Sequence, residues 1–418
     1  MNKRLLSCAF TVLAVFIAMP RGLSAQTLAT GDSRTVNQPV LPAVCQTLNA
    51  QFTSSQRSSP PSSDDTSRIQ AALNSCASSG KSVVLAASGS NNAFYSNLLT
   101  VNGEGLVINS GVTLFGNNSY ASQKELILIK GTNSSLMGPG TVDGRGDIIS
   151  GSARLVQASN ITNLIVFNIT LTQARHPNLY VEGGNGFTAW GVTIRTPANR
   201  SNADGIDIDS MTNATVINSS VNAGDDGIAV KTNSGPASNM TIKNSRFFGT
   251  HGISVGSQTF NGVTNILFTG NYVYGTDLNG IAATTQDAIR IKSDVDCGGH
   301  VDRVTYTNTC ITGAKHLIIL DTMYGSCSGT NGTPVFTNIV VNGVLSTKSV
   351  SGAYTRIRGL DSSHLIDAYL AHVSLDSTTQ SSDQDAQVAL NASNITPSGS
   401  GIQTRSFTLS GSVPTCAF

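Results

Sequence analysis

Short stretches of alternating apolar and polar residues, each ended by Asn, Gly or Asp, recur from about residue 80 onward. Three of them end at Asn218, Asn244 and Gly270, at intervals of 26 residues. Each unit holds period-two stretches and no apolar pattern of helical period, which predicts strands. Propeller blades need longer repeats, and the strands of a sandwich have no fixed period. We therefore expect an all-β chain that folds as a parallel β-helix, a solenoid whose successive coils stack.

A solenoid needs a cover over its exposed end strands. In residues 65–76, Asp65 is a candidate N-cap, and the apolar positions follow helical spacing. These positions are Ile69, Ala72, Leu73 and Cys76. We expect one short capping helix here, inside an N-terminal extension and cap over residues 26–80. Since no later linker divides the chain, residues 26–418 are expected to form a single β-helix domain.

The first 25 residues have the layout of a secretory signal peptide. Lys3 and Arg4 precede the apolar run 5–19, and a stretch of small residues ends at Ala25. The run is shorter than a membrane-spanning helix needs, and no second apolar run follows. We expect residues 1–25 to be removed and the mature protein to be secreted and monomeric.

Charge and composition exclude some partners. The chain has 25 basic and 24 acidic residues, which gives a formal net charge of +1 and no broad basic surface. Binding to nucleic acid or to an anionic membrane is therefore not expected. Glutamate occurs only at positions 104, 125 and 182, and this scarcity favours strands over solvent-exposed helices.

Six cysteines remain after the signal peptide, and an even number in an exported chain indicates disulfides. They are Cys45, Cys76, Cys297, Cys310, Cys327 and Cys416. Fifteen connectivities are possible in principle. Proximity along the chain favours Cys45 with Cys76 and Cys297 with Cys310, which leaves Cys327 for Cys416. No C-x-x-C spacing supports a zinc site, and we expect no metal or cofactor.

Acidic residues and a histidine recur at about one repeat. Asp225 and Asp226 follow Asp204 by 21 and 22 residues, and His251 lies another 25 residues beyond Asp226. Asn202 belongs to the first of these clusters. Each cluster alone is an ordinary turn sequence, because Asp and Asn bond to their own backbone and Gly allows positive φ. Their registration one coil apart is what predicts a shared site.

Two basic residues complete this set. Arg290 follows His251 by 39 residues, about one coil plus an inserted loop, and alternation turns Arg290 and Lys292 to the outer face with Ile289 and Ile291 inside. Neighbouring carboxyl groups raise each other's pKa, which suits one of them to donate a proton. Paired carboxyl groups are the minimum set for hydrolysis of a glycosidic bond. With cations beside them, the groove is predicted to act on an acidic polysaccharide.

The four motifs, in this order and spacing, resemble the signature of polygalacturonases, glycoside hydrolase family 28, and look most like the secreted bacterial endo-polygalacturonases. The similarity extends through residues 186–190, 254–257 and 320–324 and covers most of residues 130–345. It implies a right-handed parallel β-helix and metal-independent, inverting hydrolysis of α-1,4-linked galacturonan in de-esterified pectin.

The resemblance also implies roles for the catalytic residues. Asp225 is expected to be the general acid that protonates the leaving oxygen. Asp204 and Asp226 are expected to hold and activate the attacking water. His251 is expected to tune the protonation of the acid.

Four further residues are expected to bind the substrate or to shape the site. Arg290 and Lys292 match residues that bind a galacturonate carboxylate beside the scissile bond, and Tyr324 matches a substrate-contacting tyrosine. Asn202 is expected to shape the site rather than to react. The segment 276–287 is longer than the family pattern and is a candidate wall of the groove.

Other functions remain open from the sequence. An exo-polygalacturonase would have a groove closed at one end. A pectate lyase would bind Ca²⁺ through the same aspartates and cleave by elimination. A non-catalytic β-helix adhesin would bind polysaccharide without releasing reducing ends.

Overall fold

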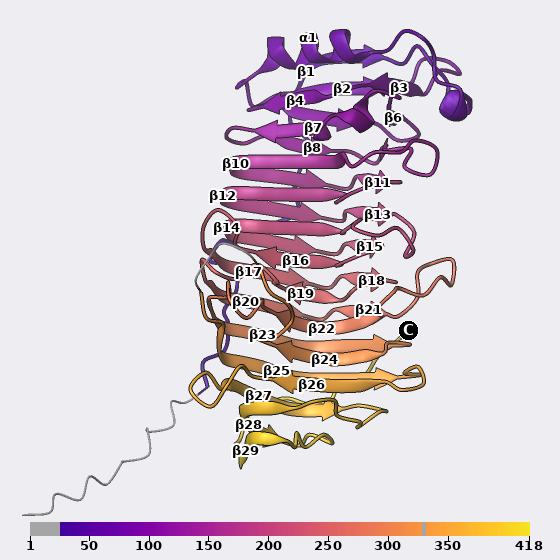
Figure 1. The fold of residues 1–418 in the computed structure, drawn as a ribbon. Coiled ribbons are helices and arrows are strands. Elements are labelled where there is room, and N and C mark those ends of the chain that lie inside the picture. Colours follow the sequence, from indigo (N-terminus) through magenta and orange to yellow (C-terminus); the bar gives the residue numbers. More distant parts are fainter. Residues whose placement is uncertain (1–25, 328–331) are drawn as a thin grey trace, which may run out of the picture.

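The computed structural model describes residues 26–327 and 332–418. In these residues 29 strands join into one continuous sheet of parallel pairings, wound into an elongated stack of coils (Figure 1). The predicted all-β parallel β-helix is confirmed. The predicted signal peptide, residues 1–25, lies outside the described residues. No helix in the described part of the chain is long and apolar enough to span a bilayer.

The sheet has three faces, each a column of parallel strands. Face 1 contains β4 (Leu99–Asn102), β7 (Glu125–Lys130), β16 (Ile228–Lys231), β19 (Ile253–Val255), β22 (Asp287–Lys292), β24 (His316–Asp321) and β26 (Tyr354–Arg358). Face 2 contains β1 (Val44–Asn49), β2 (Ser82–Ala86), β5 (Gly105–Ile108), β8 (Ser135–Met137), β17 (Ala237–Lys243), β20 (Val263–Thr269) and β29 (Ser400–Ser406). Face 3 contains β3 (Ala93–Ser96), β6 (Thr113–Gly116), β9 (Thr141–Asp143), β11 (Thr170–Thr172), β13 (Thr193–Arg195), β15 (Ser220–Asn222), β18 (Arg246–Phe248) and β21 (Tyr272–Tyr274).

Longer strands turn the corners between faces. Faces 1 and 2 share β10 (Arg154–Phe167), β12 (Leu179–Trp190), β14 (Ile206–Ile217) and β28 (Gln384–Asn391). Faces 2 and 3 share β23 (His300–Thr312), β25 (Val335–Thr347) and β27 (Ile366–Ser374). The asparagines that end the predicted strands lie at these corners: Asn168, Asn218 and Asn244 have φ of 51°, 52° and 51°. Asparagine tolerates this left-handed conformation better than most residues do, so the chain can turn there.

Stacked isoleucines on face 1 hold the site in register. Ile206, Ile228, Ile253, Ile289 and Ile318 are paired in successive strands, and all five are fully buried. β-Branched side chains fit this pleated, closely packed surface. Because alternate residues point outward, the neighbours of this row are presented on the outer surface of face 1.

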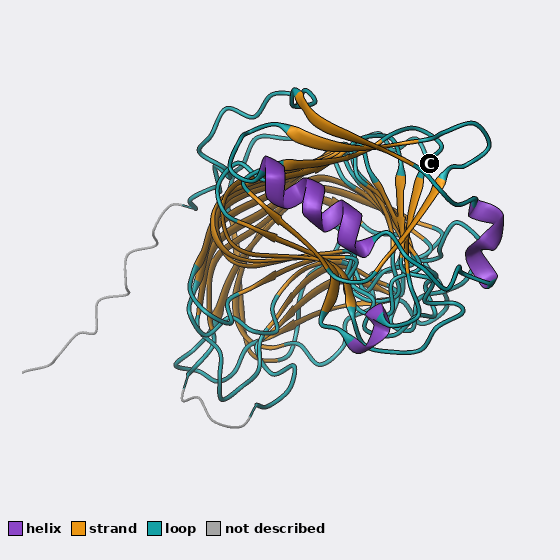
Figure 2. Cartoon of the chain, turned by 90° about the horizontal axis from the view of Figure 1, so that it is seen from above, coloured by secondary structure: helices purple, strands orange, loops and turns teal. Residues whose placement is uncertain are grey.

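The predicted capping helix is α1 (Thr66–Cys76), which lies across the open end of the coil (Figure 2). Its buried residues are the predicted set, Ile69, Ala72, Leu73 and Cys76. Asp65 is at the N-cap position, but its carboxylate does not bond to the helix backbone. It accepts instead from Arg68 Nε at 2.6 Å and from Tyr95 N at 2.9 Å. Two 3₁₀ turns, η1 (Ser54–Ser58) and η2 (Tyr120–Ser122), complete the helical elements of the described residues.

Both ends of the described chain run along the solenoid rather than away from it. Near the N-terminus, Ala29 N donates to Thr305 Oγ1 at 2.9 Å, and Arg34 Nη2 donates to Phe187 O at 2.7 Å. Residues 29–34 therefore cross several coils of face 2. At the other end, Ser410 O accepts from the Asn342 side chain, so the tail runs back from the last coil.

The cysteine pairing corrects the prediction based on chain proximity. Cys45 pairs with Cys76 as expected, but Cys297 pairs with Cys327 and Cys310 with Cys416. Cys297 precedes β23 and Cys310 lies near its end, so an extended strand holds the two apart. A residue 30 positions onward lies one coil away instead, which is the separation of Cys297 and Cys327. In a solenoid, the repeat sets spatial proximity.

The Cys310–Cys416 disulfide is expected to stabilise the last coils by fixing the returning tail. It closes a segment of 106 residues, and a loop of that length is strongly constrained by a crosslink. Replacing both cysteines with serine should lower the free energy of unfolding by about 2–4 kcal/mol, measured by urea denaturation. Ser410→Ala is the control, because only its backbone oxygen contacts Asn342. Equal midpoints for the double variant and the wild type would refute this role.

Candidate active site

The turns that lead into β14, β16 and β19 bring the predicted acidic residues together on face 1. The first residues of these three strands are in register, and Asp204, Asp226 and His251 each lie two positions before that row. Asp225 immediately precedes Asp226. One carboxylate oxygen from each of Asp204, Asp225 and Asp226 lies within 4.8 Å of the others. We refer to these three residues, which are part of the predicted site, as the aspartate cluster.

Asp226 is held by two cations. Its carboxylate accepts from Arg290 Nη2 and, at 3.0 Å, from Lys292 Nζ, and Ser254 Oγ donates to it at 2.8 Å. Burial raises the pKa of Asp226, but the charges of Arg290 and Lys292 outweigh it and hold this pKa below its usual value. Asp226 is therefore ionised. We refer to Arg290 and Lys292 as the cation pair.

The cation pair is less exposed than a solvated strand face would be. The side chains of Arg290 and Lys292 are 5% and 8% exposed. Arg290 also contacts Asp287, which His316 Nδ1 contacts in turn. Burial lowers the pKa of Arg290, but the charges of Asp226 and Asp287 outweigh burial, and the net result is a raised pKa. Asp287 and His316 were not predicted as site residues. Asp287 holds the guanidinium of Arg290, and His316 holds Asp287.

Asp225 and His251 form a separate pair. His251 Nδ1 lies 3.0 Å from Asp225 Oδ1, and the backbone N of His251 donates to Asp225 O at 2.8 Å. Burial raises the pKa of Asp225, but the hydrogen bond with His251 lowers it, and the net result is a lowered pKa. Burial lowers the pKa of His251, but Asp225 raises it more strongly. Both shifts favour an ionised Asp225 beside a protonated imidazole.

The three carboxylates differ in access to solvent. The side chain of Asp225 is 24% exposed, that of Asp204 10% and that of Asp226 3%. A ligand that approaches along the outer surface of face 1 therefore meets Asp225 first. Asp204 and Asp226 lie deeper, where they can hold a small molecule such as water.

Tyr324 and Asn202 flank the cluster on different sides. Tyr324 is 50% exposed, and its ring centroid is 5.0 Å from Lys292 Nζ and 6.0 Å from Arg290 Cζ. The structure therefore places this tyrosine beside the cation pair, and its expected contact with substrate stays a prediction. Asn202 is exposed at a φ of 56° in the turn before Asp204. Among the described residues, no hydrogen bond joins it to an aspartate.

Lys231 and Asp207 are part of the site but were not predicted. Lys231 Nζ lies 3.2 Å from Asp204 Oδ2 and 3.2 Å from Asp207 Oδ1. Strand alternation carried the signal for them, because Ile228 and Val230 face inward and Lys231 must therefore face outward. Lys231 and Asp207 do not belong to the turn motifs that recur one coil apart, so the repeat did not single them out.

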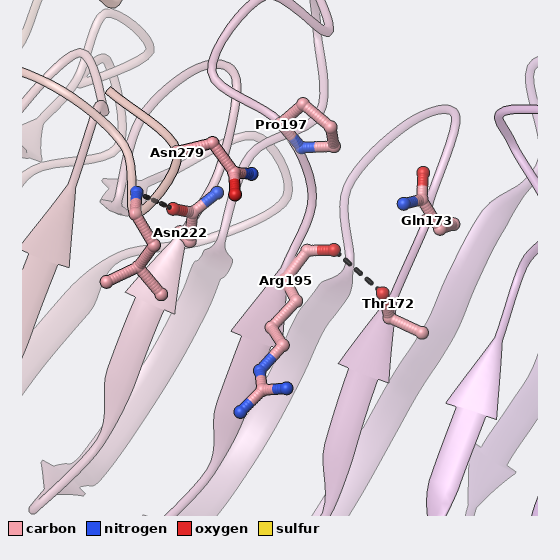
Figure 3. A pocket seen from close by; sticks show the side chains of 7 residues that line it. Thr172, Gln173, Arg195, Pro197, Asn222 and Asn279 are labelled. Carbon is pink, nitrogen blue, oxygen red and sulfur yellow. Dashed lines mark hydrogen bonds between the residues drawn. The ribbon is translucent and has the colours of Figure 1, made fainter. Parts of the chain in front are cut away.

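Part of the inserted loop, residues 277 and 278, packs against the ends of the face 3 strands and the turn after β13. Leu278 N donates to Asn222 Oδ1 at 2.8 Å, and Ala198 N donates to Asp277 Oδ2 at 3.2 Å. The loop walls a pocket of about 330 Å³ at the ends of the face 3 strands (Figure 3). This pocket is lined by Thr172, Gln173, Arg195, Pro197, Asn222, Leu278 and Asn279. None of these belongs to the predicted site.

Comparison with known proteins places this geometry in a family. The family model "Glycosyl hydrolases family 28" matches residues 76–394. An "Endo-polygalacturonase" of Pectobacterium parmentieri is 33% identical over 392 residues, which cover 84% of this chain and 90% of that protein. The one from Pectobacterium carotovorum subsp. carotovorum is 32% identical with the same coverage.

A solved structure agrees with these sequence matches. The polygalacturonase from Erwinia carotovora ssp. carotovora superposes with a TM-score of 0.75 at 31% identity, covering 85% of this chain and 99% of that one. This agreement confirms the predicted right-handed form of the β-helix. The match over most of the length, at this identity, shows the family. The chain belongs to glycosyl hydrolases family 28.

Proposed function

We propose that this chain is a secreted endo-polygalacturonase that hydrolyses α-1,4-galacturonosyl linkages in de-esterified pectin. The observation that carries the proposal is the aspartate cluster directly beside the cation pair on one face. Carboxylates supply acid and base for glycoside hydrolysis, and cations select a sugar that itself carries a carboxylate. The relatives named "Endo-polygalacturonase" support this substrate. The signal-like residues 1–25 and the three disulfides fit an exported protein.

In this proposal Asp225 protonates the leaving oxygen. It is the most exposed carboxylate of the cluster, and in the proposal the proton comes from Nδ1 of a protonated His251, 3.0 Å from Asp225 Oδ1. Movement of that proton from Nδ1 to Asp225 Oδ1 makes the carboxyl an acid at the moment when the glycosidic oxygen needs one. His251 thus holds the proton until it is transferred, because its own pKa is raised.

Asp204 and Asp226 hold and activate the attacking water. Asp226 is kept ionised by the cation pair, so it accepts a hydrogen bond from the water and orients it. Lys292 Nζ and the exposed ring of Tyr324 lie at the edge of this site, where a galacturonate carboxylate and sugar face can dock. Substrate carboxylate bound there places the scissile bond next to Asp225.

Inversion of configuration is proposed from the family resemblance rather than from the carboxylate spacing. The nearest oxygens of the cluster are within 4.8 Å, whereas inverting enzymes commonly separate their carboxyl groups by about 6.5–9.5 Å. Proton NMR of freshly released product decides the stereochemistry. The β-anomer appearing first means inversion, and the α-anomer appearing first means retention.

Release of reducing ends from de-esterified polygalacturonate tests the proposed function. Viscosity and ultraviolet absorbance are followed in parallel, with and without EDTA. A rapid fall in viscosity with saturated products, insensitive to EDTA, is the expected result. A slow fall with monomer as the early product would mean exo action instead. Binding without any release of reducing ends would indicate an adhesin.

A calcium-dependent lyase is disfavoured by the charges around the cluster. Protein cations already contact all three carboxylates: Lys231, His251, Arg290 and Lys292. A Ca²⁺ ion would have to displace them or share their acceptors. Ultraviolet-absorbing products that vanish on chelation would nevertheless show the lyase reaction.

The alkaline side of the pH profile is expected to depend on the Asp225–His251 pair. As pH rises through the raised pKa of His251, above its usual value of about 6.5, the pair loses its proton and kcat/KM falls. His251→Gln removes the imidazole that holds this proton, so the alkaline limb should move to lower pH by about 1 unit or more. Initial rates between pH 4 and 9 measure this. An unchanged alkaline limb in the variant would exclude His251 from proton supply.

A further inference from the structure

Lys231 reaches past its register partner, Asp209, to contact Asp204. In the strand register Lys231 is paired with Asp209, but Asp209 already accepts from Tyr180 Oη at 2.6 Å, from Ser210 Oγ at 2.7 Å and from Asn233 N at 2.8 Å. The lysine side chain leans instead toward Asp204 and Asp207, to which its ammonium is 3.2 Å in both cases.

The small side chain of Ala229, two residues before Lys231 on the same strand, leaves space for this arrangement. Ala229 is the register partner of Asp207 and carries only a methyl group. A larger side chain there would lie between Asp207 and the lysine stem. The ammonium can therefore sit between two carboxylates on the adjacent strand and its preceding turn.

Each carboxylate of the aspartate cluster has its own cation. Asp226 has the cation pair, Asp225 has His251, and Asp204 has Lys231. Asp204 must share its cation with Asp207, a second carboxylate close by. The other titratable groups that face Asp204 are Asp225 and Asp226 from the next turn and His176 from the preceding turn.

The two carboxylates that Lys231 contacts differ in burial. The side chain of Asp207 is 1% exposed, against 10% for Asp204. Burial, together with the charge of Asp204, raises the pKa of Asp207 well above its usual value. Burial lowers the pKa of Lys231, but the two carboxylates raise it, so the ammonium stays charged. The lysine therefore presents a full positive charge to both carboxylates.

We propose that Lys231 and Asp207 are positioning residues for Asp204: Lys231 keeps its carboxylate charged and oriented toward the attacking water, and Asp207 anchors the lysine. This role rests on the proposed hydrolysis, in which Asp204 is a base. This role assigns neither residue a contact with the substrate. A base that loses its cation takes up a proton at a higher pH, so the acidic limb of the rate profile reports the contact.

The pH dependence of kcat/KM on polygalacturonate tests the proposal. Lys231→Met should move the acidic limb upward by about 1–3 pH units, with kcat lowered at acidic pH and partly recovered at higher pH. KM should stay within about twofold, because the cation pair is untouched. Lys231→Arg should restore the wild-type limb. Asp207→Asn should leave the limb in place or move it to lower pH. Lys243→Met, at the end of β17 outside the site, is the matched control.

Two further measurements separate the possible failures. Thermal unfolding shows whether Lys231→Met is folded, and ¹³C NMR of labelled aspartate carboxyls, assigned with Asp204→Asn, follows the Asp204 titration without any turnover. A wild type that releases no reducing ends would overturn the proposed function, while the NMR titration would still test the lysine contact. An unshifted Asp204 titration in folded Lys231→Met, or a lowered rate with an unchanged limb, would overturn the positioning role.

Discussion

Replacing Asp225 with asparagine is expected to lower kcat on polygalacturonate by about 10²–10⁴-fold, the usual contribution of a positioned acid. The amide cannot pass on the proton that His251 holds 3.0 Å away, so the leaving oxygen departs unprotonated. KM should change little, because the cation pair and Tyr324 remain in place. Initial rates over a range of substrate concentrations measure both constants.

A surface pair offers a matched control for this substitution. Asp361 contacts His364 Nδ1 at 2.9 Å in an exposed turn far along the chain from the cluster. Asp361→Asn therefore removes an Asp–His contact of the same kind without touching the site, and its kcat should equal that of the wild type. If Asp225→Asn retained more than about a tenth of the wild-type kcat, Asp225 would not be the acid.

Asp225→Asn should change the pH dependence of the rate as well as lower kcat. The wild-type alkaline limb comes from a pair in which the pKa of His251 is raised by its carboxylate partner. With asparagine at position 225, His251 no longer has a negatively charged partner, and its proton can no longer reach the leaving group. The small remaining activity should therefore show no alkaline limb at the wild-type position.

The fold and the main site residues were predictable because a repeat fixes both. Backbone hydrogen bonds stack one coil on the next, so a period of about 26 residues in the chain becomes a row in space. Alternation then decided which side chains face out, as the buried Ile289 and Ile291 beside outward Arg290 and Lys292 show. The resemblance to a family added roles to residues that the spacing had already gathered.

Contacts that depend on side-chain length or on returning segments were not predictable in this way. Register pairs Lys231 with Asp209, yet four methylene groups let its ammonium reach Asp204. The partner of Cys310 is in a tail that runs back over several coils, which no repeat encodes. Asp287 holds Arg290 from its own strand, three residues away, a spacing that the coil period does not reveal.

Asp226→Asn is expected to damage both stability and catalysis. The carboxylate is buried between Arg290 and Lys292, so its loss leaves two buried cations without their shared anion. Removing one partner of a buried ion pair costs about 3–5 kcal/mol, and here Asp287 offsets part of that cost for Arg290. In the proposed mechanism the attacking water also loses one of its two acceptors, so kcat should fall by about 10²-fold or more.

The pH dependence of stability distinguishes this charge effect from a packing defect. Because the pKa of Asp226 is lowered in the folded protein, its stabilisation is fully present above the unfolded value of about 3.9 and is lost as pH falls through the folded value. The difference in unfolding free energy between wild type and Asp226→Asn should therefore be largest near neutral pH and shrink below about pH 4. Urea denaturation at several pH values measures it.

A partly exposed ion pair serves as the control for Asp226→Asn. Asp367 contacts Arg405 at 3.1 Å with both side chains more than a fifth exposed, and Asp367→Asn should cost no more than about 1 kcal/mol at any pH. A deficit in Asp226→Asn that stays constant down to pH 2 would mean that packing, not charge, explains the loss. A deficit that closes on acidification would show that the cation pair is held in place by an ionised Asp226, which is the state that the proposed water activation requires.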